Sequence, residues 1–111
     1  MEKLVSGKIA LVTGGGAGMG AADCWKFAQE GAAGILVADL NLEDAQNVCD
    51  KIMAAYPACK CVAVKTDVSK EADVDHCFEV LEQEFGTLDI LVNNAGVTNK
   101  IPFDEMTLKH W

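Results

Sequence analysis

A run of glycines directly after a short apolar segment constrains this chain more than any other feature. Lys8–Thr13 (KIALVT) predicts a buried β-strand, and it is followed at once by Gly14–Gly20 (GGGAGMG), where a helical pattern begins. A strand, a glycine loop and a helix in this order bring free backbone N–H groups and the positive end of the helix dipole to one point. Glycine permits the tight turn and lets the backbone approach a bound pyrophosphate closely. The segment therefore predicts a phosphate-binding loop.

The spacing of the glycines selects one version of such a loop. The general dinucleotide-binding pattern G-x-G-x-x-G is not met, because Met19 stands where its last glycine is required. The residues from Thr13 to Gly20 instead fit the pattern T-G-x-x-x-G-x-G.

Apolar runs and helical patterns alternate along the rest of the chain. Three of the four predicted strands carry continuous branched apolar residues, which is typical of parallel strands covered on both faces. The strands are Lys8–Thr13, Gly34–Asp39, Cys61–Thr66 and Leu88–Asn93, and the helices are Gly18–Glu30, Leu42–Tyr56 and Lys70–Phe85. Asn41 and Ser69 are the expected N-caps of the second and third helices.

The order βαβαβαβ predicts an α/β fold, with Thr107–Trp111 beginning one more helix. Right-handed crossovers make this the N-terminal half of a Rossmann-type, doubly wound parallel sheet with strand order 3-2-1-4. We expect the 111 residues to form one domain.

Asp39 ends the second predicted strand, about 20 residues after the glycine loop. A carboxylate at that place can accept hydrogen bonds from the hydroxyl groups of the adenosine ribose. It would repel a 2′-phosphate, and the chain contains no arginine that could bind one. The sequence therefore favours NAD over NADP. The alternative is that Asp39 merely caps the helix that begins near Leu42.

Motifs after the other strands point to a family. The fourth strand ends in Asn93-Asn94-Ala95-Gly96, the third is followed by Asp67-Val68, and Gly86-x-x-Asp89-Ile90-Leu91-Val92 precedes the asparagines. Together with T-G-x-x-x-G-x-G, these residues resemble the single-domain branch of the short-chain dehydrogenase/reductase family. The resemblance covers essentially the whole chain and corresponds to the N-terminal half of family members, which are more than twice as long.

The resemblance implies a nicotinamide dinucleotide as cofactor and a set of residues that surround it. These are Gly14, Gly18, Met19 and Gly20 at the pyrophosphate, Asp39 at the adenosine ribose, Asp67 and Val68 at the adenine ring, and Asn94, Ala95 and Gly96 beside the adenosine ribose. The Asp67 carboxylate would reach the adenine amino group. One asparagine would tie neighbouring strands together, and a purely structural role for both asparagines is equally open.

One residue of the first helix departs from the family pattern. Asp23 stands where the family usually carries an aliphatic residue that faces the sheet. Its carboxylate is expected either to gain from the helix N-terminus or to turn outward. If it is buried it would cost stability, and if it lies near the phosphates it would weaken cofactor binding.

The family performs its reaction with a Tyr-x-x-x-Lys pair and an upstream serine, which belong to its second half. The tyrosine exchanges a proton with the alcohol or carbonyl oxygen while hydride moves to or from the cofactor. The segment from Tyr56 to Lys60 has the Tyr-x-x-x-Lys spacing, but Pro57 breaks any helix there. The segment also precedes the third strand and so lies at the amino edge of the sheet, whereas ligands bind at the carboxyl edge. We therefore assign no catalytic residue within these 111 residues.

Composition excludes several classes of partner. The net charge of −8 argues against nucleic acid and anionic membrane surfaces, and no apolar stretch approaches the length of a membrane helix. The N-terminus does not resemble a signal peptide. Five scattered cysteines without a signal peptide favour reduced, buried thiols in the cytoplasm, and their spacing does not complete a metal site.

Two kinds of function remain from the sequence. The first is an NAD-dependent oxidoreductase acting on an alcohol or carbonyl, of which this chain supplies the cofactor-binding half. The alternative is a non-catalytic NAD-binding module, or a truncated fragment without activity of its own. In family members a fifth strand would pair with the far edge of the fourth. In the chain as given this apolar edge of the fourth strand is open, which favours self-association.

Overall fold

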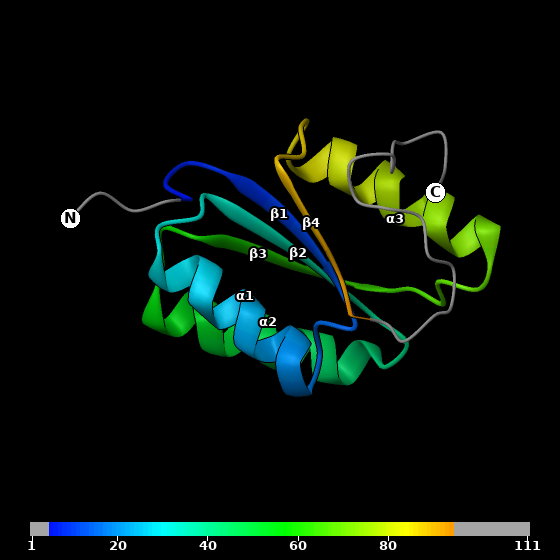
Figure 1. Ribbon diagram of the computed structural model, residues 1–111, viewed down its shortest axis with the longest axis horizontal. Coiled ribbons are helices and arrows are strands. Elements are labelled where there is room, and N and C mark those ends of the chain that lie inside the picture. The colour runs from blue at the N-terminus through cyan, green and yellow to red at the C-terminus, as the bar shows by residue number, and fades with distance from the viewer. Residues whose placement is uncertain (1–4, 95–111) are drawn as a thin grey trace.

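Parallel strands form one sheet in the computed structural model, which describes residues 5–94 (Figure 1). The strands are β1 (Ile9–Thr13), β2 (Gly34–Asp39), β3 (Lys60–Lys65) and β4 (Ile90–Asn93). Their order is β3-β2-β1-β4, which confirms the predicted order and the Rossmann-type fold. The registers pair Thr13 of β1 with both Ala38 of β2 and Asn93 of β4, so the carboxyl ends of these strands form one edge.

Helices cover both faces of the sheet. Figure 1 shows α1 (Gly18–Gln29) and α2 (Leu42–Ala55) on one face and α3 (Glu71–Glu84) on the other. This arrangement follows from right-handed crossovers between parallel strands, with the direction along the sheet reversing after β3.

The core consists of two apolar layers, one on each side of the sheet. Val12 and Val37 belong to the layer under α1 and α2, whereas Leu11 and Leu36 belong to the layer under α3. Successive strand residues point to opposite faces, so both faces of β1 and β2 must be apolar. Each fully buried Val or Leu side chain contributes about 1.5–3 kcal/mol to folding. The continuous apolar runs of the sequence are thereby explained.

Most element boundaries lie within one or two residues of those predicted, and one N-cap is different. Asn41 caps α2 as expected, because its side chain accepts a hydrogen bond from the backbone N–H of Asp44. Ser69 was the wrong cap for α3: the helix begins after Lys70, which makes no side-chain cap, and Ser69 donates its hydroxyl to Asp67 instead. Thr107–Trp111 lies outside the described residues.

The acidic helix α3 packs as its pattern predicts. Val74 and Leu81 are buried, Leu81 in the core layer under α3, and Phe78 and Phe85 are half-buried. The acidic residues Glu71, Asp75, Glu79 and Glu82 are exposed to solvent. They form a solvated face.

The five cysteines are free thiols in the structure, and all are buried, as predicted. Four of them lie in the layer under α1 and α2, and Cys77 lies under α3. Within residues 5–94, no three His, Cys, Asp or Glu side chains are grouped so that they could hold a metal ion.

Two predictions concern the chain as a whole. Among the described residues, β4 pairs only with β1, and the proposed self-association through its other edge stays a prediction. The same holds for the assignment of residues 1–111 to a single domain. In the part of the chain that the structure describes, every helix is too short or too polar to cross a membrane.

Candidate functional site

The glycine loop lies at the carboxyl edge of the sheet, between β1 and α1. Gly14 has φ +63° and Gly18 has φ +57°, which is the left-handed region that residues with a side chain adopt at a cost. A Cβ atom on Gly20 would collide with the carbonyl group of Gly14, since the first turn of α1 packs directly on the loop. The loop therefore needs glycine at these positions, where the sequence pattern places it.

The N-terminus of α1 differs in charge from those of the other two described helices. Its N-cap is Ala17, whose side chain cannot cap, and its first turn contains no acidic residue. The first turn of α2 contains Glu43 and Asp44, and acidic residues likewise begin α3. The first N–H groups of a helix have no partner within the helix, and the dipole adds positive charge there. The start of α1 thus offers free donors to an anion.

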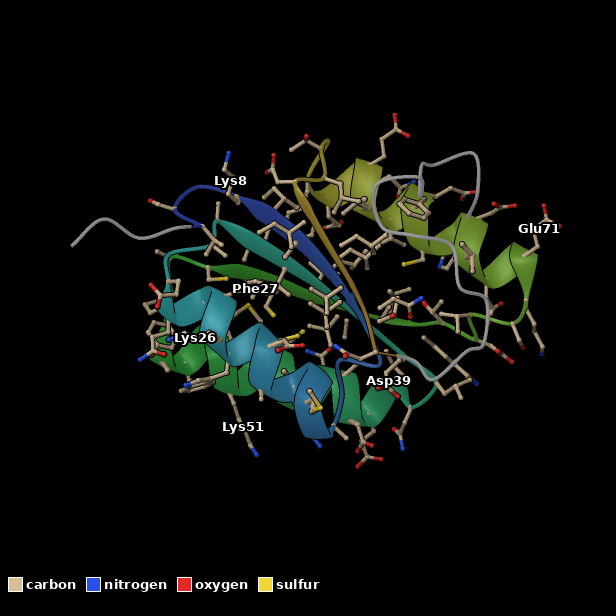
Figure 2. All side chains as sticks on the ribbon, in the orientation of Figure 1. Lys8, Lys26, Phe27, Asp39, Lys51 and Glu71 are labelled. Atoms are coloured by element: carbon tan, nitrogen blue, oxygen red, sulfur yellow. The ribbon has the colours of Figure 1, made fainter. Side chains whose placement is uncertain are left out.

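Asp39 lies beside the glycine loop at the end of β2. One of its carboxylate oxygens, Oδ2, accepts the backbone N–H of Gly16 at 2.9 Å, and the other, Oδ1, accepts that of Asn41 at 2.9 Å. Asn41 itself caps α2, so Asp39 is not the N-cap that the alternative interpretation required. Figure 2 shows Asp39 at the opposite end of the sheet from Lys8, which precedes β1.

The hydroxyl of Thr13 connects the ends of β1 and β4. It donates to Oδ1 of Asn93 at 2.7 Å and accepts the backbone N–H of Asn94 at 3.2 Å. Thr13 is fully buried, and both hydrogen bonds are partly buried. Asn93 is therefore the asparagine that ties neighbouring strands together, as the family resemblance implied.

The side chain of Asn94 contacts α1. Its amide Nδ2 donates to the carboxylate Oδ2 of Asp23 at 2.9 Å. Asp23 is half-buried near the start of α1, so its side chain is not turned fully outward. Stabilisation by the helix N-terminus stays a prediction. The carboxylate has a specific partner from a strand far away in sequence.

Asp67 and Val68 form the loop between β3 and α3, and both are half-buried. Asp67 Oδ1 accepts both the hydroxyl of Ser69 at 2.6 Å and its backbone N–H at 3.0 Å. These hydrogen bonds from Ser69 lower the pKa of Asp67, so the carboxylate stays ionised at neutral pH. The loop continues directly from the carboxyl end of β3, at the same edge of the sheet as Asp39.

The structure brings most of the predicted residues to this one edge. Asp39 is the last residue of β2, and the glycine loop, Asp67, Val68 and Asn94 follow the carboxyl ends of the other strands. Ala95 and Gly96 lie outside the described residues. Two residues with clear contacts had no assigned role from the sequence, namely Gly16 and Thr13. Both stand inside the T-G-x-x-x-G-x-G motif, and that position was the available signal.

Tyr56 and Lys60 lie at the opposite edge, near the start of β3. Tyr56 packs edge-on against Trp25 with ring centroids 5.4 Å apart. Lys60 pairs with Glu84 at 3.0 Å and lies over the ring of Phe85. These contacts agree with their exclusion as a catalytic pair.

The family model for short chain dehydrogenases matches residues 8–111. The chain belongs to this family. YuxG of Bacillus subtilis, an uncharacterized oxidoreductase, is 49% identical over 110 residues, which are 99% of this chain and 16% of YuxG. YusS of the same organism, a short-chain dehydrogenase/reductase homolog, is 38% identical over 102 residues, which are 92% of this chain and 92% of YusS. The chain thus spans a small part of YuxG and nearly all of YusS.

Solved structures of family members superimpose on the chain. L-sorbose reductase from Gluconobacter frateurii, complexed with NADPH and L-sorbose, has a TM-score of 0.81 and 31% identity over all of this chain and 41% of the reductase. A short-chain dehydrogenase/reductase from Burkholderia phymatum in complex with NAD has a TM-score of 0.73 and 31% identity, covering 82% of this chain and 31% of that protein. Structural relatives therefore bind both kinds of nicotinamide dinucleotide.

Proposed function

We propose that this chain forms the cofactor-binding part of an oxidoreductase that transfers hydride between NAD and an alcohol or carbonyl substrate. One observation carries the proposal: the Asp39 carboxylate accepts the backbone N–H of Gly16 at 2.9 Å, in the loop that leads into α1. An acceptor for ribose hydroxyls therefore lies next to the uncapped N-terminus of α1. A dinucleotide carries a pyrophosphate next to a ribose, and this pair of groups suits it. The family membership and the relatives with NAD and NADPH support the same conclusion.

Asp39 keeps enough acceptor capacity to bind both ribose hydroxyls. Each carboxylate oxygen has about two lone-pair positions, and each accepts one backbone N–H in the structure. One further hydrogen bond from a hydroxyl group can therefore be added at each oxygen without breaking those contacts. The backbone bonds hold the carboxylate in place before the cofactor binds, which reduces the entropy lost on binding.

The charges near Asp39 support NAD over NADP. A 2′-phosphate would lie against the Asp39 carboxylate, and Asp44 is half-buried in the first turn of α2 beside Gly16. Like charges at such distances repel, and the chain has no arginine to offset them. NADP would therefore bind more weakly than NAD.

Residues 1–111 supply no group to the proton transfer in this proposal. Bound NAD would supply the hydride acceptor, and this chain would bind and orient it through the α1 N-terminus, Asp39, and the loop of Asp67 and Val68. The acid–base residues of the reaction would come from sequence beyond these 111 residues.

The test is a titration with NADH and, in parallel, NADPH, followed by cofactor fluorescence. We expect saturable binding of NADH at least tenfold tighter than that of NADPH. Asp39→Asn should weaken NADH binding about tenfold, since hydrogen bonds to a charged group contribute about 1.5–3 kcal/mol. Asp75→Asn, an exposed carboxylate of α3, is the matched control and should leave binding unchanged. Absence of NADH binding by the folded chain would refute the proposal.

The second candidate is a non-catalytic NAD-binding module. It is favoured by YusS, which this chain matches over 92% of both sequences. The two candidates are distinguished by an intact-mass measurement on native material together with a dehydrogenase assay over a range of alcohols. A native mass equal to that of the 111 residues, with NADH binding and no turnover, would support the module.

A further inference from the structure

We propose that Asp23 is a positioning residue of the candidate cofactor site, which orients the side-chain amide of Asn94 so that its oxygen accepts a hydroxyl of the dinucleotide. The inference rests on the proposed function, because it assigns a role within the same site. It concerns a residue for which the family resemblance gives no role, since an aliphatic side chain is usual at this position.

The hydrogen bond between the two side chains has only one possible direction. An ionised carboxylate accepts hydrogen bonds and cannot donate them, so the group of Asn94 that faces Asp23 at 2.9 Å must be the NH₂. The amide oxygen Oδ1 of Asn94 therefore points away from Asp23. Within residues 5–94 this oxygen has no hydrogen-bond partner. Asp23 thereby determines which end of the amide is available to a ligand.

The backbone of Asn94 is held independently of its side chain. Its N–H lies 3.1 Å from the carbonyl oxygen of Thr13 and 3.2 Å from the Thr13 hydroxyl. With the backbone held in this way, rotation of the side chain is the remaining freedom. The carboxylate of Asp23 removes that freedom through a charge-assisted bond, about twice as strong as a neutral one.

The location of Asp23 makes this contact relevant to the cofactor. Asp23 lies one turn after Gly20 on α1, the helix whose uncapped N-terminus is the proposed pyrophosphate site. Asn94 directly follows β4, at the carboxyl edge of the sheet. The hydrogen bond between Asp23 and Asn94 therefore joins α1, the proposed phosphate-binding helix, to the end of β4, which pairs with β1. A dinucleotide has two riboses, and a ribose hydroxyl that does not donate to Asp39 is the donor it offers to a fixed amide oxygen.

Binding of NADH to two Asp23 variants tests the orientation. Asp23→Asn retains a side-chain oxygen that can accept from Asn94 Nδ2, so its affinity should stay within about twofold of the original chain. Asp23→Leu has no acceptor, so the Asn94 amide can turn, and NADH binding should weaken about five- to tenfold. Asp75→Leu on the exposed face of α3 is the matched control and should bind normally.

A double variant separates orientation from general stability. If Asp23 acts through Asn94, then Asp23→Leu should add no further loss of affinity in an Asn94→Ala background. Urea unfolding of each variant confirms that the titrated protein is folded. Should Asp23→Leu fail to fold, Asp23→Ser, whose short hydroxyl does not replace the carboxylate, takes its place in both comparisons.

The outcomes distinguish this inference from the proposed function. If the original chain does not bind NADH, the proposed function fails and the role of Asp23 fails with it. If the original chain binds NADH but Asp23→Leu binds equally well, only the role of Asp23 is refuted. An additional loss from Asp23→Leu in the Asn94→Ala background would likewise refute it, because Asp23 would then act by another route.

Discussion

The Asp39 carboxylate accepts the backbone N–H of Gly16 at 2.9 Å, which ties the end of β2 to the glycine loop. A second bond, from the N–H of Gly15 to the carbonyl oxygen of Ala38 at 3.2 Å, reinforces the connection. The conformation of the glycine loop and the position of the Asp39 carboxylate therefore depend on each other. A substitution in the loop should displace the carboxylate, and a substitution of Asp39 should alter the loop.

Gly20→Ala should damage both stability and cofactor binding. The new methyl group would collide with the carbonyl group of Gly14, so the helix must move away from the loop. We expect a loss of about 1–3 kcal/mol in the free energy of unfolding, typical of overpacking, despite the better helix propensity of alanine. Urea unfolding measures the stability, and NADH titration should show at least tenfold weaker binding. An unchanged affinity would mean that α1 does not contact the cofactor.

Gly18→Ala and Gly7→Ala form a matched pair for the loop conformation. Both glycines have positive φ, +57° and +75°, and a Cβ atom would meet no neighbour at either position. Each substitution should therefore cost a similar amount, about 1–2 kcal/mol, from backbone strain alone. Only Gly18→Ala should weaken NADH binding, since Gly7 lies at the other edge of the sheet. Equal effects of both variants on binding would argue against the loop as the phosphate site.

Leu40→Arg should shift the cofactor preference toward NADP. Leu40 follows Asp39 and is 63% exposed, so a guanidinium group can be accommodated there without repacking the core. Arginine binds phosphate through paired hydrogen bonds and would offset the charge of Asp39. We expect the Kd for NADPH to fall about tenfold while that for NADH changes little, as measured by fluorescence titration. Leu40→Gln, of similar size and neutral, should leave the ratio of the two unchanged.

Thr13→Val should destabilise the chain more than Thr66→Val. Both hydroxyls are buried at strand ends, and that of Thr13 bonds Asn93 and Asn94. The Thr66 hydroxyl faces the Cys77 thiol, a weak partner, and has no conventional hydrogen bond. We expect a loss of about 1–2 kcal/mol for Thr13→Val and less than about 0.5 kcal/mol for Thr66→Val. Thermal unfolding should show a drop of several degrees for the first variant only. Equal shifts would contradict the central role given to Thr13.

Stability should fall in alkaline solution because of the buried thiols. Burial raises the pKa of Cys77 to about 11 and that of Cys24 to about 12, from an ordinary value of 9.0. The folded chain keeps these protons above pH 9 while the unfolded chain loses them, so the stabilisation is complete below about pH 9 and decreases above it. Cys77 alone should account for a loss of about 2 kcal/mol by pH 11. Urea unfolding from pH 8 to 11 measures it, with Cys77→Val as the reference that lacks this thiol. Parallel profiles for the two proteins would show that Cys77 does not titrate in this way.

Local patterns were sufficient to predict the elements and their order. The apolar runs of β1 and β2 are continuous because both faces of the sheet are covered, and that pattern was visible in the sequence. The glycine loop was predictable because Gly14 and Gly18 need a conformation that other residues avoid. Asn41 was predictable as a cap because its partner lies three residues away. Ser69 failed as a cap because the helix begins one residue later, with Lys70 at the N-cap position, and the Ser69 hydroxyl donates to Asp67.

Contacts between distant segments were decided only by the tertiary structure. The sequence by itself determined the α/β fold, the strand order and the residues at the carboxyl edge, because these follow from local periodicity and the handedness of crossovers. It could not determine that Asp23 bonds Asn94, 71 residues away, or that Thr13 bonds Asn93, 80 residues away. Such bonds depend on the relative placement of a helix and two strands after packing. No local pattern encodes that placement, and it decides which polar groups meet at the site.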